Sequence, residues 1–188
     1  MRIITGTARG TRLKTPRGLA TRPTADRIKE SLFNILGHRV QGRRVLDLFA
    51  GTGNLGLEAL SRGAAEAVFV DRATAPLIRE NAVHTHLLDR ARIEQADVFT
   101  ALNRLRGEDA PFDLVFCDPP YGKGLWQRTL QALDHLPLLS PEVLIVVEHG
   151  ATENDVPELT VLACQRNQRY GRTTQVSIFA PRGAAQEA

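Results

Sequence analysis

VLDLFAGTGNLGLE, the stretch from Val45 to Glu58, joins a short apolar run to three closely spaced glycines. The apolar residues predict a buried strand that ends at Phe49, and the glycines predict a turn into a helix that begins near Asn54. Glycine lets the backbone turn sharply and approach a ligand closely, and the first turn of a helix presents unpaired N–H groups. The loop is therefore a candidate nucleotide site, although its match to GxGxxG is by itself a weak indication. Its glycines are Gly51, Gly53 and Gly56.

Two acidic residues indicate which nucleotide this loop holds. Asp47 lies within the predicted strand, where a carboxylate would repel a pyrophosphate but can hold an ammonium group. We therefore expect S-adenosylmethionine (SAM), whose methionine end carries an amine, rather than NAD. Asp71 closes the next apolar run about 20 residues further on, where it can accept hydrogen bonds from the ribose hydroxyls of either cofactor. For both residues, a capped or solvated acid at a strand end is the alternative.

The composition is that of a globular chain with one substantial core, because 43% of its 188 residues are hydrophobic. No apolar run approaches the roughly 20 residues that span a bilayer, and the N-terminus lacks the apolar region of a signal peptide, so we expect a cytoplasmic protein. Cys117 and Cys164 are too few for a disulfide framework and lack metal-ligand spacing, so both are expected in the core. The scattered histidines predict no metal site, and we expect structural or surface roles for His38, His84, His86, His135 and His149.

The net charge is +3, and the charged residues are distributed unevenly along the chain. Residues 1–44 carry eleven basic and two acidic side chains, a net charge of +9, which leaves −6 for the rest of the chain. Clustered cations release counterions from phosphates, so a basic segment on an acidic body is typical of a nucleic-acid-binding protein. A merely soluble basic tail is the alternative. The residues expected to contact RNA are Arg9, Arg12, Lys14, Arg17, Arg27 and Lys29.

The N-terminal segment is expected to form a small extension. Two short extended runs around residues 6–10 predict a β-hairpin whose tip presents Arg9, and such a hairpin is marginal alone, so it should dock on the body or on RNA. The two runs are residues 2–5 and 11–15. Thr24 is the expected N-cap of a helix that Gly37 ends. This helix leaves two basic side chains available to solvent or substrate, Arg27 and Lys29.

From residue 44 onward the sequence alternates between strand and helix patterns, which predicts a parallel sheet with helices on both faces. Two late extended runs leave no room for a helix between them, so they should form an antiparallel pair at one edge. The predicted fold is α/β and Rossmann-like, with a mostly parallel sheet of seven strands. The strands are expected at residues 45–49, 67–70, 92–96, 112–117, 143–147, 159–164 and 173–179, and the helices at 54–62, around 77–83, after 97 and at 125–135.

Four acidic residues are expected at the carboxyl ends of parallel strands, where ligands bind in such sheets. They are Asp47, Asp71, Asp97 and Asp118. Asp97 is placed to accept from an adenine amino group, with Phe99 as one wall of that site, and a helix N-cap explains Asp97 equally well. Glu148 closes the fifth apolar run and has no assigned role.

The sequence Asp118-Pro-Pro-Tyr121 supplies the groups that methylation of a base amine needs. The lone pair of such a nitrogen is delocalised into the ring, and an acceptor for each N–H can turn it toward a methyl donor. The Asp118 carboxylate and the Pro119 carbonyl are two such acceptors, and Pro119 and Pro120 fix the backbone that carries them. Tyr121 offers a flat face on which an extruded base can stack. A proline turn with Tyr121 in the core is the alternative.

Taken together, DLFAGTG at residues 47–53 and DPPY at residues 118–121 resemble the class I SAM-dependent amino-methyltransferases. Three further pieces resemble more narrowly the RsmD family, bacterial methyltransferases that act on guanine N2 in 16S ribosomal RNA of the small subunit. These pieces are RIITGTARG at 2–10, RPTADRIKESLFN at 22–34 and GLEALSRGA at 56–64. The resemblance covers residues 2–180. It implies SAM as the cofactor, a 16S guanine presented by a ribosomal assembly as the substrate, and a monomer.

The resemblance also suggests roles that composition does not show. Arg22, Pro23 and Thr24 would close over the methionine end of SAM. Asp71 stands where many relatives have glutamate, which shortens the reach to the ribose by one methylene. We accordingly assign residues 1–40 to a basic extension, 41–181 to the methyltransferase domain and 182–188 to a flexible tail.

Three other functions fit parts of the sequence. A DNA adenine or cytosine amino-methyltransferase would use the same DPPY motif, but the chain has no separate region large enough for a target-recognition domain. An NAD-dependent oxidoreductase would share the glycine loop but is disfavoured by Asp47 and by DPPY. A non-catalytic RNA-binding assembly factor with the same fold is the third.

Overall fold

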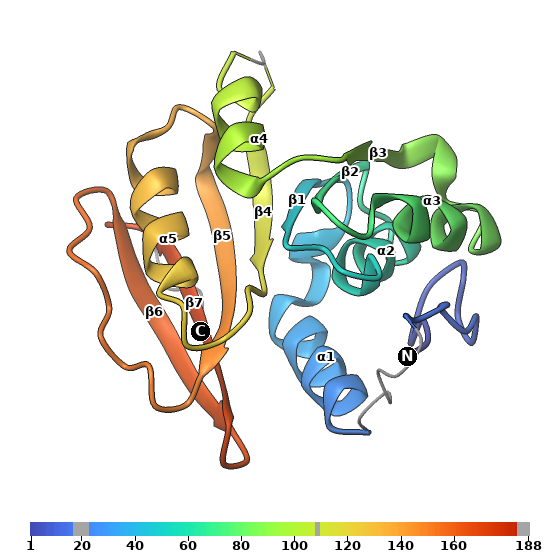
Figure 1. Cartoon of the computed structure of the whole chain (residues 1–188), viewed down its shortest axis with the longest axis horizontal. Helices are drawn as coiled ribbons and strands as arrows, with labels where there is room; N and C mark the ends of the chain where they lie inside the picture. Colours follow the sequence, from blue (N-terminus) through green and yellow to red (C-terminus); the bar gives the residue numbers. More distant parts are fainter. Residues whose placement is uncertain (17–22, 108–109, 184–188) are drawn as a thin grey trace. The chain divides into compact units, whose positions relative to one another are not determined.

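The computed structural model describes residues 1–16, 23–107 and 110–183 and divides into two compact units, Met1–Val98 and Phe99–Ala188. Figure 1 shows the helices and strands of both units. No helix in the described ranges has the length and apolar character needed to cross a bilayer. Residues 1–40, predicted as an extension that packs on the core, belong to the first unit. The boundaries of the predicted methyltransferase domain and tail stay predictions.

Three parallel strands make up the sheet of the first unit, in the order β3-β2-β1: β1 (Arg44–Leu48), β2 (Glu66–Val70) and β3 (Ala91–Glu94). Four consecutive residues of β1 and of β2 are buried, as expected of strands covered on both faces. In this register Asp47 lies beside Phe69. The prediction that Asp97 closes the third strand is wrong. The strand ends at Glu94 because the chain turns there, where the Ala96 N–H donates to the Glu94 carbonyl at 3.1 Å.

The helices of the first unit are α1 (Pro23–Leu36), η1 (Gly37–Val40), α2 (Asn54–Ser61), α3 (Ala75–His84) and η2 (Leu88–Arg90). α1 begins at Pro23, since the fixed φ and missing N–H of proline suit the first helical position. Thr24 is therefore the second residue of α1, and its prediction as the N-cap is wrong. α2 packs tightly on the sheet, because a Cβ at Gly56 would lie only 2.3 Å from the Phe69 ring.

The predicted β-hairpin is shorter than expected, since the described residues contain one isolated bridge, between Arg2 and Arg12, in place of a ladder. Residues between these two form turns that are held by α2. The backbone N–H groups of Ile4 and Thr5 donate to the Glu58 carboxylate at 2.8 and 3.0 Å. The N-terminal segment thus docks on the body, as expected of a hairpin too small to be stable alone.

The second unit has four strands in the order β4-β5-β7-β6. β4 and β5 are parallel, while β7 is antiparallel to both β5 and β6. Figure 1 shows α5 lying against β5 on one face of these strands. The elements of this unit are α4 (Val98–Leu105), whose first residue belongs to the first unit, β4 (Phe112–Cys117), α5 (Leu125–His135), β5 (Leu139–Gly150), β6 (Leu162–Tyr170) and β7 (Thr174–Pro181).

The prediction of an α/β, Rossmann-like fold with seven mostly parallel strands and an antiparallel edge pair is confirmed. β5 is longer than predicted, so Glu148 lies within this strand, paired with Val176 of β7. Cys117 is buried, as predicted, but Cys164 is exposed. The core assignment of Cys164 is wrong because it lies on β6, an edge strand in which only the first residue, Leu162, is buried.

Candidate active site

The glycine loop joins β1 to α2 in the first unit. Its backbone is left-handed at Phe49 (φ 58°), Gly51 (φ 58°) and Gly53 (φ 78°). Glycine adopts this conformation without penalty, whereas Phe49 is strained, and strain of this kind clusters at functional sites. The Gly53 N–H donates to the Ala50 carbonyl at 2.7 Å, which closes the turn immediately before α2. The predicted glycine turn from strand to helix is therefore present.

Asp47 is buried against the start of α2, with 2% of its surface exposed. Its Oδ2 accepts a 2.8 Å hydrogen bond from the Gly56 N–H, in the first turn of the helix. Burial raises the pKa of Asp47 to about 8; the Gly56 hydrogen bond opposes this shift and the negative charge of Asp71 adds to it. A cationic ligand group would offset both the burial and the repulsion, so this carboxyl is suited to bind one.

Asp71 follows β2 and organises the same loop. Its Oδ2 accepts from the Gly51 N–H at 3.0 Å, and its Oδ1 accepts from the N–H groups of Ala73 and Thr74 at 2.8 and 2.9 Å. The carboxylate thus ties the turn before α3 to the glycine loop. Each carboxylate oxygen has two lone pairs, so Oδ2 retains capacity for a ligand hydroxyl.

The donor and acceptor set of this loop fits SAM better than NAD. A Cβ at Gly51 would meet no heavy atom nearer than the Phe49 carbonyl oxygen, at 3.9 Å, so a ligand can approach the backbone there. A cation such as an amine would favour the ionised form of the buried Asp47 carboxyl, whereas a pyrophosphate would add to the charge repulsion that already raises the pKa of this group. The residues present therefore fit the cofactor that the sequence predicts.

The two residues expected near adenine belong to different units. Asp97 is exposed and immediately precedes α4, a place that agrees with the N-cap alternative as well as with a ligand contact. The guanidinium of Arg128 lies 4.7 Å from the ring centroid of Phe99, which is a cation–π contact. Their roles toward adenine stay predictions.

In the second unit, β4 leads directly into the tetrapeptide Asp118-Pro-Pro-Tyr121. Asp118 and Pro120 are exposed and Pro119 is buried. Tyr121 has 40% of its surface exposed, so the alternative in which this side chain fills the core is wrong. The loop therefore combines an exposed carboxylate with an exposed aromatic ring, as the sequence predicts.

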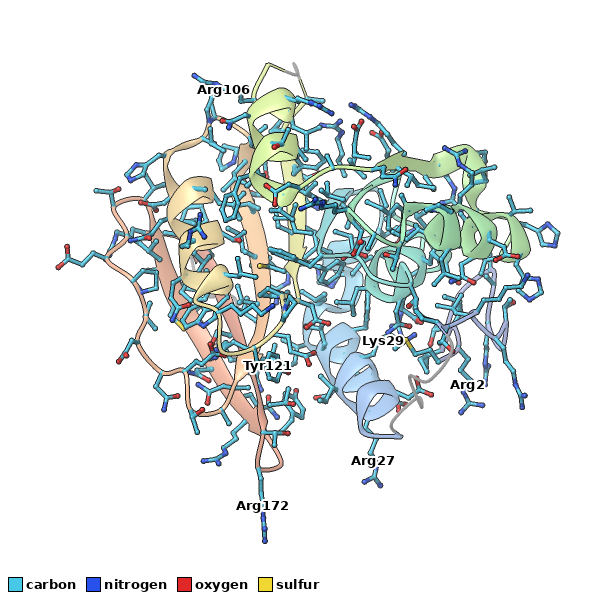
Figure 2. The ribbon with its side chains drawn as sticks, in the orientation of Figure 1. Arg2, Arg27, Lys29, Arg106, Tyr121 and Arg172 are labelled. Carbon is cyan, nitrogen blue, oxygen red and sulfur yellow. The ribbon has the colours of Figure 1, made fainter. Side chains whose placement is uncertain are left out.

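The Tyr121 side chain is held at its hydroxyl. The O–H donates to Glu148 Oε1 at 2.7 Å and lies 3.3 Å from Thr174 Oγ1. Burial and the nearby charge of Glu148 raise the pKa of Tyr121, so the hydroxyl remains protonated and able to donate. Burial also raises the pKa of Glu148, and the hydrogen bond from Tyr121 opposes this shift. Figure 2 shows where Tyr121 lies in the loop between β4 and α5.

A second carboxylate holds the same loop and was missed by sequence reasoning. Glu153 Oε1 accepts from the Gly122 N–H at 3.0 Å, and its Oε2 accepts from the Gly150 N–H at 2.9 Å. A Cβ at Gly150 would lie 2.7 Å from that Oε2, so glycine leaves room for the contact. No motif includes Glu153. Glu148, by contrast, could be singled out from the sequence because it closes the fifth apolar run.

Four of the six basic residues expected to contact RNA are exposed, namely Arg9, Arg12, Lys14 and Arg27. Lys14 forms an ion pair with Glu80. Figure 2 shows Arg27 extending away from the ribbon of α1. The expectation that Lys29 is available to solvent or substrate is wrong, because only 1% of its surface is exposed and its Nζ lies 3.1 Å from Glu58 Oε2.

Three predicted site residues cannot be placed by their side chains. Arg17 and Arg22 lie outside the described residues. The backbone of Thr24 belongs to α1, but its side chain is outside the described part. Their proposed contacts with RNA and with SAM stay predictions.

Among the described residues no cluster of histidines, cysteines and carboxylates could hold a metal ion. His149 is buried and stacks on Trp126, with ring centroids 4.5 Å apart. Its Nε2 lies within hydrogen-bond distance of Ser177 Oγ, at 2.9 Å. Burial lowers the pKa of His149, so the structural role predicted for it agrees with a neutral ring packed between α5 and β7.

The fold and the glycine loop define a SAM-dependent methyltransferase as the class of protein. The chain belongs to the RsmD family, because a model of the family described as "Conserved hypothetical protein 95" matches residues 1–179 and curated members are close relatives. "Putative rRNA methyltransferase YlbH" of Bacillus subtilis is 38% identical over 97% of this chain and 100% of that protein. "Ribosomal RNA small subunit methyltransferase D" of Escherichia coli is 40% identical over 84% of this chain and 78% of that protein.

Solved structures have the same fold. "Putative methyltransferase yhhF from Escherichia coli" superposes with a TM-score of 0.82 at 36% identity and covers 96% of this chain and 97% of its own. An RNA methyltransferase from Salinibacter ruber, solved in complex with S-adenosyl-L-homocysteine, shares the fold at a TM-score of 0.61 and 16% identity, over 90% of this chain and 98% of its own.

Proposed function

We propose that this methyltransferase transfers a methyl group from SAM to the exocyclic N2 amine of one guanine in 16S rRNA of the small ribosomal subunit. The observation that carries the proposal is the loop after β4, where the exposed Asp118 carboxylate is followed by a tyrosine ring with 40% of its surface exposed. The rRNA methyltransferases among the relatives and the charge of +9 on residues 1–44 support RNA as the substrate.

The first unit would hold most of the cofactor. Asp47 would face the amine of the methionine end, and Asp71 would accept from the ribose hydroxyls through the lone pairs left on Oδ2. When bound, SAM supplies an electrophilic methyl group on its sulfonium. The remaining candidates for cofactor contacts are Phe49, Gly51, Gly53, Asp97, Phe99, Arg22 and Thr24.

The second unit would hold the acceptor base. The Asp118 carboxylate accepts from one N–H of the amine and the Pro119 carbonyl accepts from the other, which turns the nitrogen lone pair out of conjugation with the ring. The Tyr121 ring stacks on the base and keeps it extruded, while Pro120 fixes the backbone between carboxylate and ring. A methylated amine carries one proton too many, and Asp118 is the acceptor placed to take it.

The basic residues of the first unit would bind the RNA backbone. Three exposed side chains can each reach a phosphate, namely those of Arg9, Arg12 and Arg27. Lys14 can do so once its ion pair with Glu80 is broken. We also propose that the protein acts in the cytoplasm, as a monomer, on RNA within a small-subunit assembly.

Labelled SAM tests this function directly. The protein is incubated with unmodified small subunits, with naked 16S rRNA and with duplex DNA, and the product is digested to nucleosides and identified by mass spectrometry. We expect label in small-subunit RNA as N2-methylguanosine. Methylated adenine or cytosine in DNA would instead identify a DNA methyltransferase, and no transfer at all would favour a non-catalytic RNA-binding factor.

Asp118→Ala tests the assigned residue within the same assay. Transfer should be abolished while SAM affinity, measured by calorimetry, is retained. Asp155→Ala removes another exposed carboxylate of the second unit and should leave turnover unchanged. Normal turnover by the Asp118 variant would refute the role given to this residue.

A further inference from the structure

Glu148 lies next to the groups proposed to hold the base, yet the transfer described above gives it no role. The parallel pairing of β4 with β5 places Cys117 beside Val147, so Asp118 and Glu148 are the next residues along two adjacent strands. The Glu148 carboxylate also reaches the Tyr121 hydroxyl, at 2.7 Å. Glu148 therefore contacts the stacking ring, and it occupies the position on β5 that follows the partner of Cys117, as Asp118 follows Cys117 itself.

The Glu148 carboxylate has acceptor capacity to spare. An ionised carboxylate offers about four lone-pair sites, and Tyr121 uses one of them, on Oε1. In the described part of the chain no hydrogen bond reaches Glu148 Oε2. A partly desolvated carboxylate with an open oxygen is stabilised by a further N–H donor. Burial raises the pKa of Glu148 and the Tyr121 hydrogen bond opposes this shift, so a further N–H donor would also favour the ionised form.

Guanine presents three N–H hydrogens on the edge that carries its exocyclic amine. Two are on N2, where Asp118 and Pro119 would accept them, and the third is on the neighbouring ring nitrogen, N1. In adenine and cytosine the ring nitrogen beside the amine carries a lone pair instead, which a carboxylate oxygen would repel. A third acceptor at this edge would therefore distinguish guanine from the other two amino bases.

We propose that Glu148 accepts the N1–H of the target guanine and thereby selects guanine over adenine and cytosine. The proposal rests on the proposed function, since the motif Asp118–Tyr121 suits the amine of all three bases and does not by itself choose among them. The Tyr121 hydroxyl holds Glu148 in place from one oxygen, which leaves the other to bind the base.

The test replaces the methylated guanine by 2-aminopurine. This base keeps the amine on C2 but has a lone pair, not a hydrogen, on N1. Once the target guanine is mapped in small-subunit RNA, the substituted RNA is prepared by ligation and assembled in the same way as the guanine substrate. The measured quantity is the ratio of kcat/KM for guanine to kcat/KM for 2-aminopurine.

We expect the wild-type ratio to be at least about 10, the scale of discrimination that one base-edge hydrogen bond provides. Glu148→Gln should lower this ratio at least about tenfold, because the amide NH2 can donate to N1 of 2-aminopurine while the amide oxygen still accepts from Tyr121. Glu153→Gln is the matched control, since it makes the same change in a carboxylate that holds only backbone N–H groups. It should lower both rates in proportion and leave the ratio unchanged.

Two outcomes would overturn the proposal. Equal rates of the wild-type protein on the two bases would do so without any variant, and so would a Glu148→Gln ratio equal to that of the wild type, which would leave Glu148 only the role of positioning Tyr121. A wild-type protein that methylates no guanine in small-subunit RNA would instead contradict the proposed function itself.

Discussion

Lys29 Nζ lies 3.1 Å from Glu58 Oε2, and both side chains are buried, with 1% and 0% of their surfaces exposed. Lys29 also donates to the Arg2 carbonyl at 2.6 Å and to Asn54 Oδ1 at 2.8 Å. Burial lowers the pKa of Lys29, and the charge of Glu58 opposes this shift. The cluster joins the N-terminal segment and α1 to Asn54, the first residue of α2, directly after the glycine loop. Figure 2 labels two of its members, Arg2 and Lys29.

Lys29→Met should destabilise the protein strongly. The substitution removes one of the two cations paired with the buried Glu58 carboxylate and leaves Arg62, at 2.8 Å, as the other. Removing one partner of a buried ion pair costs about 3–5 kcal/mol. Because Arg62 still pairs with Glu58, we expect the free energy of unfolding to decrease by an amount near the lower limit, about 3 kcal/mol. Urea denaturation followed by circular dichroism measures it.

Arg27→Met provides the control on the same helix. Its side chain is exposed, so its removal should change the free energy of unfolding by no more than about 0.5 kcal/mol. Equal effects of the two substitutions would show that the buried cluster contributes nothing specific.

The error about Lys29 shows where sequence reasoning reached its limit. Lys29 precedes Leu32 and Phe33 by three and four residues, and both are buried, so its helical position lay on the apolar face. The prediction that Lys29 is accessible relied on the charge of its side chain and disregarded its position on the helix. Its partner Glu58 belongs to another helix, and no local pattern indicates a pair so far apart in the sequence.

Local patterns did predict the elements that depend on them. The bounds of β4 were predicted to the residue and those of α5 approximately, because each is an apolar or helical run closed by turn residues. The left-handed glycine loop was predictable for the same reason. The contact between Tyr121 and Glu148 spans 27 residues and depends on the register of neighbouring strands, which a single sequence does not reveal.

Gly56→Ala should destabilise the first unit even though alanine favours helices. A Cβ at this position would lie 2.3 Å from Phe69 Cε1 and 3.0 Å from Asp47 Oδ2, so the helix or the ring has to move. Overpacking of this kind costs about 1–3 kcal/mol, which exceeds the gain of up to about 1 kcal/mol from helix propensity. Gly107→Ala is the matched control because nothing lies within 4 Å of its Cβ. A Gly56 variant as stable as this control would contradict the tight packing.

Asp47→Asn should change how stability depends on pH. The pKa of Asp47 rises from 3.8 to about 8 on folding, so the folded state holds a proton that the unfolded state releases between these values. Wild-type stability therefore falls as the pH rises through this range, by up to about 1.4 kcal/mol per unit, and asparagine removes this contribution. The Tm of the variant relative to the wild type should increase from pH 5 to pH 8 in calorimetry. A Tm difference that is independent of pH would show that Asp47 is already ionised in the folded protein.

The same substitution should weaken SAM binding if Asp47 holds the amine of the cofactor. Asparagine still accepts from the Gly56 N–H, so the loop keeps its hydrogen bond while the negative charge is removed. A charge-assisted contact is worth about 1.5–3 kcal/mol, which corresponds to a rise in Kd of roughly 10-fold or more at pH 8 by calorimetry. An unchanged Kd would assign Asp47 to capping α2 alone.

Arg9→Glu with Arg12→Glu should weaken binding to small-subunit RNA without changing the Kd for SAM. Both arginines are exposed in the N-terminal segment, and removing one interaction with a phosphate should reduce the slope of log K against log salt concentration by about 0.7–0.9. The difference from the wild type should therefore be largest at low salt, in filter binding over a salt series. Arg104→Glu with Arg106→Glu reverses the same charge at exposed positions of the second unit and should have a much smaller effect. Equal decreases of RNA affinity in both double variants would indicate a nonspecific effect of net charge, and a decrease of SAM affinity in the first would indicate misfolding instead.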